Sequence, residues 1–457
     1  MADAPRAVIL AAGQGTRMKS ARPKALHPLA GRPMILRIID AAATATGALP
    51  VVVLSPGQPA VREAVRMVAE VVEQAEPRGT GDALRSLPPG LRDDGPVVVL
   101  YGDLPLLRAE TIRSLVRTQA ATGAACVLLT VVPDRPAGLG RVMRGDSGRV
   151  ERIVEERDLS SGEPVPAECN AGVYVFLGRR LWPALDRLSD DNAQGERYLT
   201  DVVALLAPEV EAVLATDPEE GMGVNDRHQL AGAESVLRRR ILEALMLDGV
   251  TVEDPGTTYV DAQVRVGADT VLRPMTVLRG ETVIGRDCEI GPMAQIRDAR
   301  IGDRVRIGAS AIDDAEIGDD VEIGHFNRVR PGSVLESGVS LGTHAEVKNS
   351  RVGAGGRINH FSCVLDSDLG GDVNAGAGTV TCNYDGTEKH RTAIGEGSFV
   401  GSNSSLVAPL RIGRGAYVAA GSTVTRDVPD GALAVGRARQ RNVEGWRHRA
   451  RPESSPE

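Results

Sequence analysis

The stretch VDAQVRVGADTVLRPMTVLRGETVIGRDCEIGPMAQI, residues 260–296, decides the fold of the C-terminal part of the chain. An aliphatic residue recurs there at every sixth position, and a glycine often follows it. The aliphatic residues are Val260, Val266, Leu272, Leu278, Ile284, Ile290 and Ile296. A six-residue period is typical of a parallel β-helix, in which three hexads close one triangular coil. The sequence therefore predicts that these side chains stack as a column in the interior.

The same period returns after slips of one residue. It resumes at Ile301 and Ile307, then runs from Ile317 to Val347 and from Ile394 to Val424. We therefore expect residues 250–457 to form a β-helix domain with a basic C-terminal tail. A narrow coil interior also explains why only 3% of the residues are aromatic. Of the 52 glycines, those of the C-terminal part are mostly explained by tight corners.

The N-terminal part has a different pattern, in which short apolar runs alternate with stretches of helical period. The apolar runs are Ala7–Leu10, Val51–Leu54, Val97–Tyr101 and Ala125–Val132, and the helical stretches include Met34–Thr46 and Ala109–Ala121. Continuous apolar strands separated by helices indicate a mostly parallel sheet that is covered on both faces. We predict a Rossmann-like α/β domain over residues 1–228 and a linker helix over residues 229–249.

Composition limits the classes of function. The formal net charge of −8 argues against broad capture of nucleic acid. The five cysteines form no CxxC pair and are odd in number, which is typical of reduced thiols in a cytoplasmic protein. The N-terminus does not have the pattern of a signal peptide, and no apolar run approaches the roughly 20 residues that cross a bilayer. We expect a soluble cytoplasmic protein without membrane insertion.

The segment LAAGQGTRM, Leu10 to Met18, directly follows the first predicted strand. Backbone N–H groups of such a glycine loop suit a polyphosphate. Met18 stands where a dinucleotide-binding fingerprint would have its third glycine, which argues against that motif. Arg17 and Lys24 are two cations suited to neutralising triphosphate charge. An ordinary turn between a strand and a helix remains the alternative for the loop alone.

Asp103 ends the predicted buried strand VVVLYGD, at the edge of an α/β sheet where ligands collect. Mg²⁺ held by one or two carboxylates and by substrate phosphates needs such a group. Taken alone, an aspartate at this point is as readily the N-cap of a helix.

A set of motifs resembles the sugar-nucleotide pyrophosphorylases. The motifs are LAAGxGTRM, PK at 23–24, GTGxA at 79–83, YGD at 101–103, GLGR at 138–141, IVEE at 153–156, CNAGVY at 169–174 and GVND at 223–226. With the hexapeptide half attached, nearly the whole chain resembles the bifunctional N-acetylglucosamine-1-phosphate uridyltransferase/glucosamine-1-phosphate acetyltransferase family. The resemblance implies an N-terminal nucleotidyltransferase domain, a left-handed β-helix, and the supply of UDP-N-acetylglucosamine for cell-wall synthesis.

The resemblance also implies the residues of the first reaction, in which N-acetylglucosamine-1-phosphate attacks the α-phosphorus of UTP and pyrophosphate leaves. Gln74, Gly79 and Thr80 would read the uracil, and Asp103 and Asn225 would hold Mg²⁺. Arg17 and Lys24 would neutralise charge during catalysis. The full set implied for UTP or the UDP-sugar is Leu10, Ala11, Ala12, Gly13, Lys24, Gln74, Gly79, Thr80, Tyr101, Gly102, Asp103, Gly140, Glu155, Asn170 and Asn225. One departure is Asp82, where the family usually has histidine.

Three histidines of the β-helix, His325, His344 and His360, lie about one 18-residue coil apart. Stacked histidines could bind zinc at a subunit interface. The other interpretation is that His360 acts as a general base, since a neutral imidazole accepts a proton near pH 7. The nearby TVTCNYDG, residues 379–386, interrupts the hexads and resembles the acetyltransferase signature of the family.

By resemblance, His360 would deprotonate the amino group of glucosamine-1-phosphate as that group attacks acetyl-CoA. Arg330, Lys348, Cys363 and Asn374 would bind the amino sugar phosphate. Acetyl-CoA would contact Ala377, Asn383, Tyr384, Ser402, Ala420 and Arg437. Cys363 replaces a family tyrosine that contacts the sugar phosphate, and we expect its thiol to be packing rather than a nucleophile.

The resemblance implies a homotrimer with the acetyl-transfer sites between subunits, acting on small molecules, with Mg²⁺ as cofactor and with acetyl-CoA and UTP as co-substrates. The alternative that Cys363 leaves open is a uridyltransferase whose β-helix serves only as a trimerisation scaffold.

Overall fold

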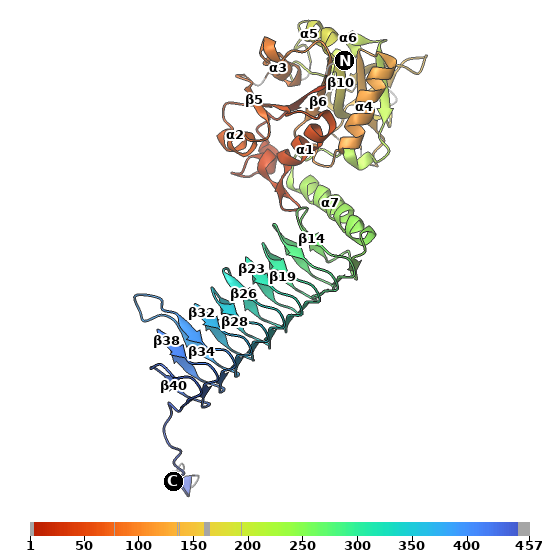
Figure 1. Ribbon diagram of the computed structural model, residues 1–457. Coiled ribbons are helices and arrows are strands. Elements are labelled where there is room, and N and C mark those ends of the chain that lie inside the picture. The colour runs from red at the N-terminus through yellow and green to blue at the C-terminus, as the bar shows by residue number, and fades with distance from the viewer. Residues whose placement is uncertain are drawn as a thin grey trace, which may run out of the picture. The chain divides into compact units, whose positions relative to one another are not determined.

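A computed structural model gives the structure of the chain over residues 4–446, with residues 77, 135, 137, 160–164 and 193 left out of the description. The chain divides into two compact units, Met1–Arg240 and Ile241–Glu457. Figure 1 shows an α/β unit and a stack of short strands, and each is described by itself. The predicted fold class, an α/β nucleotidyltransferase domain followed by a left-handed parallel β-helix, is confirmed.

The first unit is built on one sheet with the strand order β11-β7-β10-β6-β1-β4-β5, and β8 and β9 join it beside β10. The strand bounds are β1 Arg6–Leu10, β4 Val51–Leu54, β5 Glu70–Glu73, β6 Pro96–Tyr101, β7 Cys126–Val131, β8 Arg141–Arg144, β9 Val150–Val154, β10 Cys169–Leu177 and β11 Val210–Leu214. A two-stranded hairpin, β2 (Pro28–Leu29) and β3 (Arg32–Pro33), stands apart from this sheet. Strand β1 pairs in parallel with β4 and β6, whereas β10 runs antiparallel to both β6 and β7. The four apolar runs of the sequence are thus β1, β4, β6 and β7, and each is almost wholly buried.

Helices cover both faces of this sheet and make two apolar layers. Their bounds are α1 Met34–Thr46, α2 Pro59–Val65, α3 Thr80–Arg85, α4 Ala109–Thr122, α5 Gly178–Leu185 and α6 Asp201–Leu206. A further helix, α7 (Arg227–Leu247), packs apart from these two layers. Residues of α1 and α4, such as Ile38 and Leu115, pack in one layer, and residues of α5 and α6, such as Leu181 and Val203, pack in the other. Helices α1 and α4 end before Gly47 and Gly123, which adopt the left-handed conformation that stops a helix.

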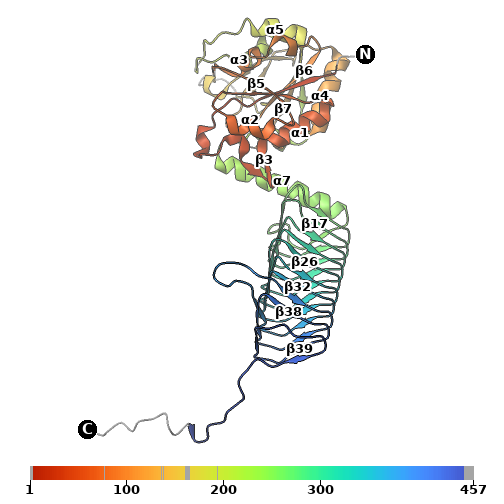
Figure 2. The same ribbon diagram turned by 60° about the vertical axis from the view of Figure 1, so that its left-hand side comes forward.

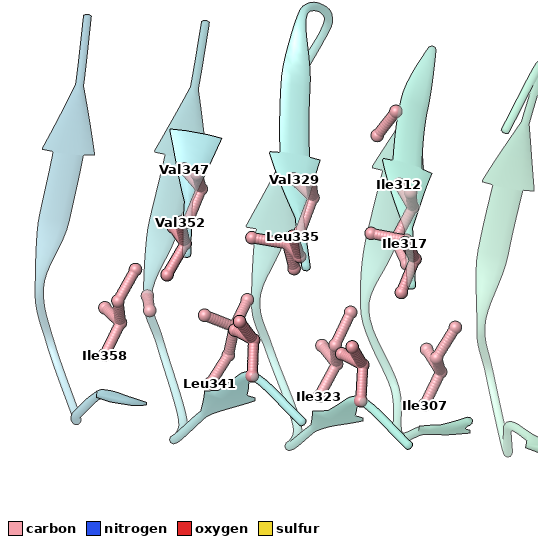
Figure 3. Close-up of a cluster of buried hydrophobic side chains, with 14 of the residues drawn as sticks. Ile307, Ile312, Ile317, Ile323, Val329, Leu335, Leu341, Val347, Val352 and Ile358 are labelled. Atoms are coloured by element: carbon pink, nitrogen blue, oxygen red, sulfur yellow. The ribbon is translucent and has the colours of Figure 1, made fainter. Parts of the chain in front are cut away.

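In the second unit, the described residues form three parallel sheets of 11, 10 and 9 short strands, from β12 (Thr251–Val252) to β41 (Leu433–Ala434). Up to β37, each strand pairs with the strand three further on, so that Leu272 is in register with Ile290, and Ile290 with Ile307. At the end of the stack β39 pairs with β41. Figure 3 shows such aliphatic side chains stacked toward the space between the sheets. All members of the predicted ladder are buried except Val266, which is half-buried and packs against the others.

Buried residues that the six-residue count skipped complete the interior. Ile312, Val352, Ile358, Val364 and Leu369 are all buried in the same core. They were skipped because several steps, such as those from Ile307 to Ile312 and from Val347 to Val352, are five residues long. Each one-residue slip therefore shortens one corner and leaves the column unbroken.

The glycines of the β-helix serve two physical purposes. Gly285 follows a core aliphatic residue, and a Cβ added there would lie 2.5 Å from the carbonyl oxygen of Gly302 in the next coil. Gly338 instead has a φ of 71° at a corner. From the sequence, these glycines were expected at corners. Close approach of neighbouring coils is the reason at the position after the aliphatic residue.

Helix α7 contributes apolar residues to both units. Ala233 and Val236 pack with Leu29 and Met34 of the first unit, and Leu242 packs into the β-helix core. Although α7 is long, the described part of the chain contains no helix with the length and apolarity needed to span a membrane.

Candidate functional sites

The first unit contains a cavity of about 260 Å³ where the carboxyl ends of β1 and β6 lie side by side. Most of the residues predicted to bind the nucleotide line it. The lining residues are Leu10, Ala11, Ala12, Gly13, Lys24, Ala25, Gln74, Gly79, Thr80, Ala83, Tyr101, Gly102, Asp103 and Glu196. Ala25, Ala83 and Glu196 were not predicted, and Arg17, Gly140, Glu155, Asn170 and Asn225 are not in this lining.

Backbone hydrogen bonds fix the point at which the glycine loop leaves β1. The N–H of Ala11 donates to Val53 and that of Gly102 donates to Leu10, both at 2.9 Å. Gly15 has a φ of 65°, and a Cβ there would lie 2.5 Å from the Cβ of Lys24. Glycine at this position therefore lets the loop approach Lys24. Arg17 follows in a short 3₁₀ turn with its side chain exposed.

The ammonium of Lys24 marks a cation position in the cavity. Its Nζ lies 2.7 Å from Oδ2 of Asp103 and donates to Oδ1 of Asn225 at 2.9 Å. Lys24 lies in a 3₁₀ turn, Lys24–Leu26, and Asp103 follows β6. Asn225 lies just before α7, and its neighbour Val224 donates a backbone hydrogen bond to the carbonyl of Asp103 at 2.9 Å. One carboxylate and one amide oxygen thus converge on a point that already holds a positive charge.

One end of the cavity is formed by the segment Arg78–Gly81, which pairs with Arg197. The N–H of Gly81 donates to the carbonyl of Arg197, and the N–H of Arg197 donates to that of Arg78, both at 2.9 Å. A Cβ on Gly79 would lie 2.5 Å from the carbonyl oxygen of Arg197. The glycines of the GTG motif are therefore required for this close backbone contact. Leu199 donates to the hydroxyl of Thr80 at 3.0 Å, which fixes the start of α3.

The predicted sugar-phosphate residues lie together beside Tyr101. Asn170 on β10 donates a backbone hydrogen bond to Gly140 at 2.9 Å, and its side-chain nitrogen donates to the hydroxyl of Tyr174 at 2.7 Å. Glu155 follows β9 and accepts a hydrogen bond from Thr200 at 3.0 Å. Burial raises the pKa of Glu155, and the nearby carboxylates of Asp158 and Asp201 raise it further.

In the β-helix, His360 belongs to a column of residues that occupy the same position in successive coils. Gly378, next to Ala377, donates to the carbonyl of His360 at 2.8 Å, and Asn403, next to Ser402, donates to that of Ala377 at 2.7 Å. Gly421, next to Ala420, donates to the carbonyl of Ser402 at 2.8 Å. The structure therefore places three of the predicted acetyl-CoA residues in line with His360.

The ring of His360 closes a corner of the preceding coil. Its Nδ1 accepts from the backbone N–H of Thr343 at 3.1 Å and lies 3.2 Å from the hydroxyl of Thr343. His325 makes the matching bond to Ala309 at 3.1 Å. His344 lies in the neighbouring column, between the rings of Phe326 and Phe361, with centroid separations of 5.2 and 4.9 Å. Within the described residues, no group of three or more His, Cys, Asp or Glu could hold a metal ion.

Cations converge near the loop that joins β34 (Val380–Cys382) to β35 (Thr392–Ile394), which projects from the coils (Figure 2). The nearby Lys389 ammonium lowers the pKa of Lys348, and partial burial and the positive charge of Arg330 lower it further. Arg330 also forms an ion pair with Glu346 at 2.7 Å. Hydrogen bonds from Asn349 and Asn383, together with Lys348 and Lys389, lower the pKa of Asp366, so a carboxylate already lies among these cations.

The other residues predicted for acetyl transfer surround this region. Asn374 accepts from the side chain of Asn359 at 2.8 Å, and Asn383 donates to Asp366. Tyr384 is 59% exposed on the loop. Burial, together with Glu346, raises the pKa of the Cys363 thiol, which keeps it protonated. Arg437 is exposed beyond β41, and Arg447, Arg449 and Arg451 of the basic tail lie outside the described residues.

Several neighbours of these residues were not found by sequence reasoning. Arg197, Thr200 and Thr343 touch predicted residues but belong to no motif that we singled out. Thr343 could have been found from the repeat, because it precedes His360 by 17 residues, close to one coil. Arg197 has no comparable signal, because it is brought to Asp82 only by the fold.

A nucleotide-binding α/β sheet joined to a hexapeptide β-helix defines a nucleotidyltransferase with an appended acyltransferase-type domain. Residues 7–210 match the model of the MobA-like NTP transferase domain, and residues 391–426 match that of the hexapeptide repeat of succinyl-transferase. The chain is similar to proteins named Bifunctional protein GlmU. That of Brevibacillus brevis is 44% identical and covers 95% of both chains. That of Heliobacterium modesticaldum is 46% identical, covering 96% of this chain and 97% of its own.

The chain belongs to the GlmU family of bifunctional proteins. It is a bifunctional enzyme with uridyltransferase and acetyltransferase activities, as the sequence motifs predicted.

Proposed function

We propose that residues 1–228 carry the uridyl transfer, that residues 229–249 link the two halves, and that residues 250–457 carry the acetyl transfer. The cavity lined by the glycine loop, Lys24 and Gln74 is the observation that supports this assignment most strongly, because it brings the loop, a cation and an amide side chain together. UTP binds there, and the phosphate of N-acetylglucosamine-1-phosphate approaches from the side of Gly140, Glu155 and Asn170. Its oxygen attacks the α-phosphorus, and pyrophosphate leaves.

Asp103 and Asn225 fit a magnesium ion, since their oxygens already converge on one positive charge, the Nζ of Lys24. When bound, Mg²⁺ supplies neutralisation of the phosphate charge. Lys24 then contacts the phosphates, and Arg17, which is exposed on the 3₁₀ turn after the glycine loop, adds a second cation. These residues contribute by positioning the substrates and neutralising charge, because the reaction needs no covalent intermediate.

For the acetyl transfer, we propose that Arg330, Lys348 and Lys389 hold the phosphate of glucosamine-1-phosphate near Cys363 and Asn374. His360 accepts a proton from the attacking amine at Nε2. Because Nδ1 accepts from Thr343 in this conformation, that step needs the other tautomer, in which Nδ1 donates to the Thr343 hydroxyl. Acetyl-CoA lies along Ala377, Ser402 and Ala420, with Asn383, Tyr384 and Arg437 at its edge.

We also infer a homotrimer. One corner of the β-helix carries exposed apolar side chains, including Phe326 at 61% and Phe361 at 66% exposure. Exposed patches of this kind mark interaction surfaces. Substitution Phe361→Glu should lower the mass measured by light scattering and reduce acetyl transfer without reducing uridyl transfer. An unchanged mass would place the interface elsewhere.

The five free thiols are consistent with a cytoplasmic location.

The uridyltransferase assignment is tested with UTP, N-acetylglucosamine-1-phosphate and Mg²⁺ and the purified full chain. We expect a UDP-sugar and pyrophosphate in equal amounts, and we expect Lys24→Met to lose most of the rate. The matched control is Lys19→Met, in which an exposed lysine outside the cavity lining is changed. No UDP-sugar from the unaltered chain would overturn the assignment.

A further inference from the structure

The orientation of the Gln74 amide is determined by its neighbours. Gln74 follows the edge strand β5, lines the cavity and is 3% exposed. Its side-chain nitrogen Nε2 lies 3.2 Å from the carbonyl oxygen of Gly79 and 3.2 Å from Oδ2 of Asp82. Both neighbours can only accept hydrogen bonds, so the end of the amide that faces them must be the nitrogen.

Asp82 is itself held by Arg197. The guanidinium Nη1 donates to Oδ1 of Asp82 at 3.3 Å, and the two side chains are 26% and 19% exposed. The backbone of Arg197 is fixed in place, because it pairs with Arg78 and Gly81 through two hydrogen bonds of 2.9 Å. The carboxylate of Asp82 is thus anchored on one oxygen and is free to accept from Gln74 on the other.

We propose that Asp82 and Arg197 are positioning residues that make Gln74 present its oxygen, Oε1, to the pyrimidine base and so select uracil over cytosine. The proposal rests on the proposed binding of UTP in this cavity. Uracil carries a donor at N3–H, which an amide oxygen accepts. Cytosine carries a lone pair at N3, which that oxygen repels.

Selection depends on how hard it is to turn the Gln74 amide over. A turned amide would place Oε1 against two acceptors, the carbonyl of Gly79 and the carboxylate of Asp82. Asparagine at position 82 can offer an NH₂ group instead, so only the carbonyl of Gly79 would still oppose the turned orientation of Gln74. Asp82→Asn should therefore weaken the discrimination while leaving the volume of the site almost unchanged.

The test compares UTP with CTP as substrates of the full-length chain, with KM and kcat measured separately for both. Asp82→Asn is expected to reduce the ratio of kcat/KM for UTP over that for CTP by about tenfold or more. The change should lie mainly in KM. Arg197→Gln, which releases Asp82, is expected to have a smaller effect in the same direction. The matched control is Asp186→Asn. Asp186 forms an exposed ion pair at 3.6 Å with Arg85, which lies on α3 as Asp82 does, and the substitution removes that pair.

An unchanged UTP/CTP ratio in both Asp82→Asn and Arg197→Gln would overturn the proposal, and so would an equal change in Asp186→Asn. If Asp82→Asn loses acetyl transfer as well, the variant is misfolded and Arg197→Gln carries the test. An unaltered chain that makes no UDP-sugar would instead defeat the proposed function. Calorimetric binding of UTP and CTP supplies a readout independent of turnover.

Discussion

The two units bring distant residues together in different ways. In the α/β unit, Lys24, Asp103 and Asn225 are far apart in the sequence and meet because strand ends and the start of α7 share one edge. In the β-helix, His360 and Ala377 are one coil apart, and each coil stacks on the next. The first site therefore forms only when the whole α/β unit has folded. The second forms wherever non-repeating residues, such as His360, stand at the same position of successive coils. Substitutions should consequently damage one activity without affecting the other.

The largest effect is expected for His360→Ala, which removes the proposed base. Acetyl transfer should fall by about 10²- to 10⁴-fold, because that is the usual contribution of a positioned general base. Uridyl transfer should remain as in the unaltered chain. Rates of CoA release and of UDP-sugar formation check both statements. His325→Ala is the control, because His325 makes the same corner bond two coils earlier in the same column. An equal loss in that control would show that the corner bond, and not base chemistry, is responsible.

Asp103→Ala should have the reciprocal effect. Removal of a group that stabilises charge at the reacting phosphates should lower uridyl transfer by about 10²- to 10³-fold. Acetyl transfer should stay intact, since the affected residue lies in the other unit. The two rates are measured on the same preparation. Loss of both activities would contradict the independence of the two sites.

A pair of glycines tests the close stacking of the coils. A Cβ on Gly318 would lie 2.7 Å from the backbone nitrogen of Ser337, whereas one on Gly338 would meet nothing closer than 3.8 Å. Gly318→Ala should therefore lower the free energy of unfolding by about 1–3 kcal/mol through overpacking. Gly338→Ala should cost only the left-handed backbone strain, about 1 kcal/mol. Denaturant unfolding of both variants measures the difference. Equal effects would contradict the account of the two kinds of glycine.

The smallest effect is expected at Glu155, whose pKa burial raises. The folded protein then binds a proton that the unfolded chain has released, so stability falls as pH rises above the ordinary glutamate pKa. Glu155→Gln should raise Tm by about 2–4 °C at neutral pH and lose this gain near pH 4. It should also raise KM for the sugar phosphate. A Tm difference that does not depend on pH would contradict this prediction.

Much of the fold could be predicted from the sequence, because buried parallel strands and hexads have strong periods of their own. Ile312 and Val352 were skipped because a fixed count cannot follow five-residue steps. The nucleotide site was predicted through its motifs, and most of those residues line one cavity. Arg197 and Glu196 could not be predicted, since no local pattern indicates that this segment pairs with residues 78–81. The hydrogen bond from the Thr343 N–H to Nδ1 of His360 could not be predicted either, because it depends on how neighbouring coils stack.

The most direct test of the account is a coupled reaction of the purified full chain with glucosamine-1-phosphate, acetyl-CoA, UTP and Mg²⁺. The site with Cys363 departs most from the family pattern, so CoA release is the decisive signal. We predict that free CoA and UDP-N-acetylglucosamine both form, and that Cys363→Tyr preserves or increases the rate. Uridyl transfer from N-acetylglucosamine-1-phosphate without any CoA release above background would contradict the account. The β-helix would then be a trimerisation scaffold only.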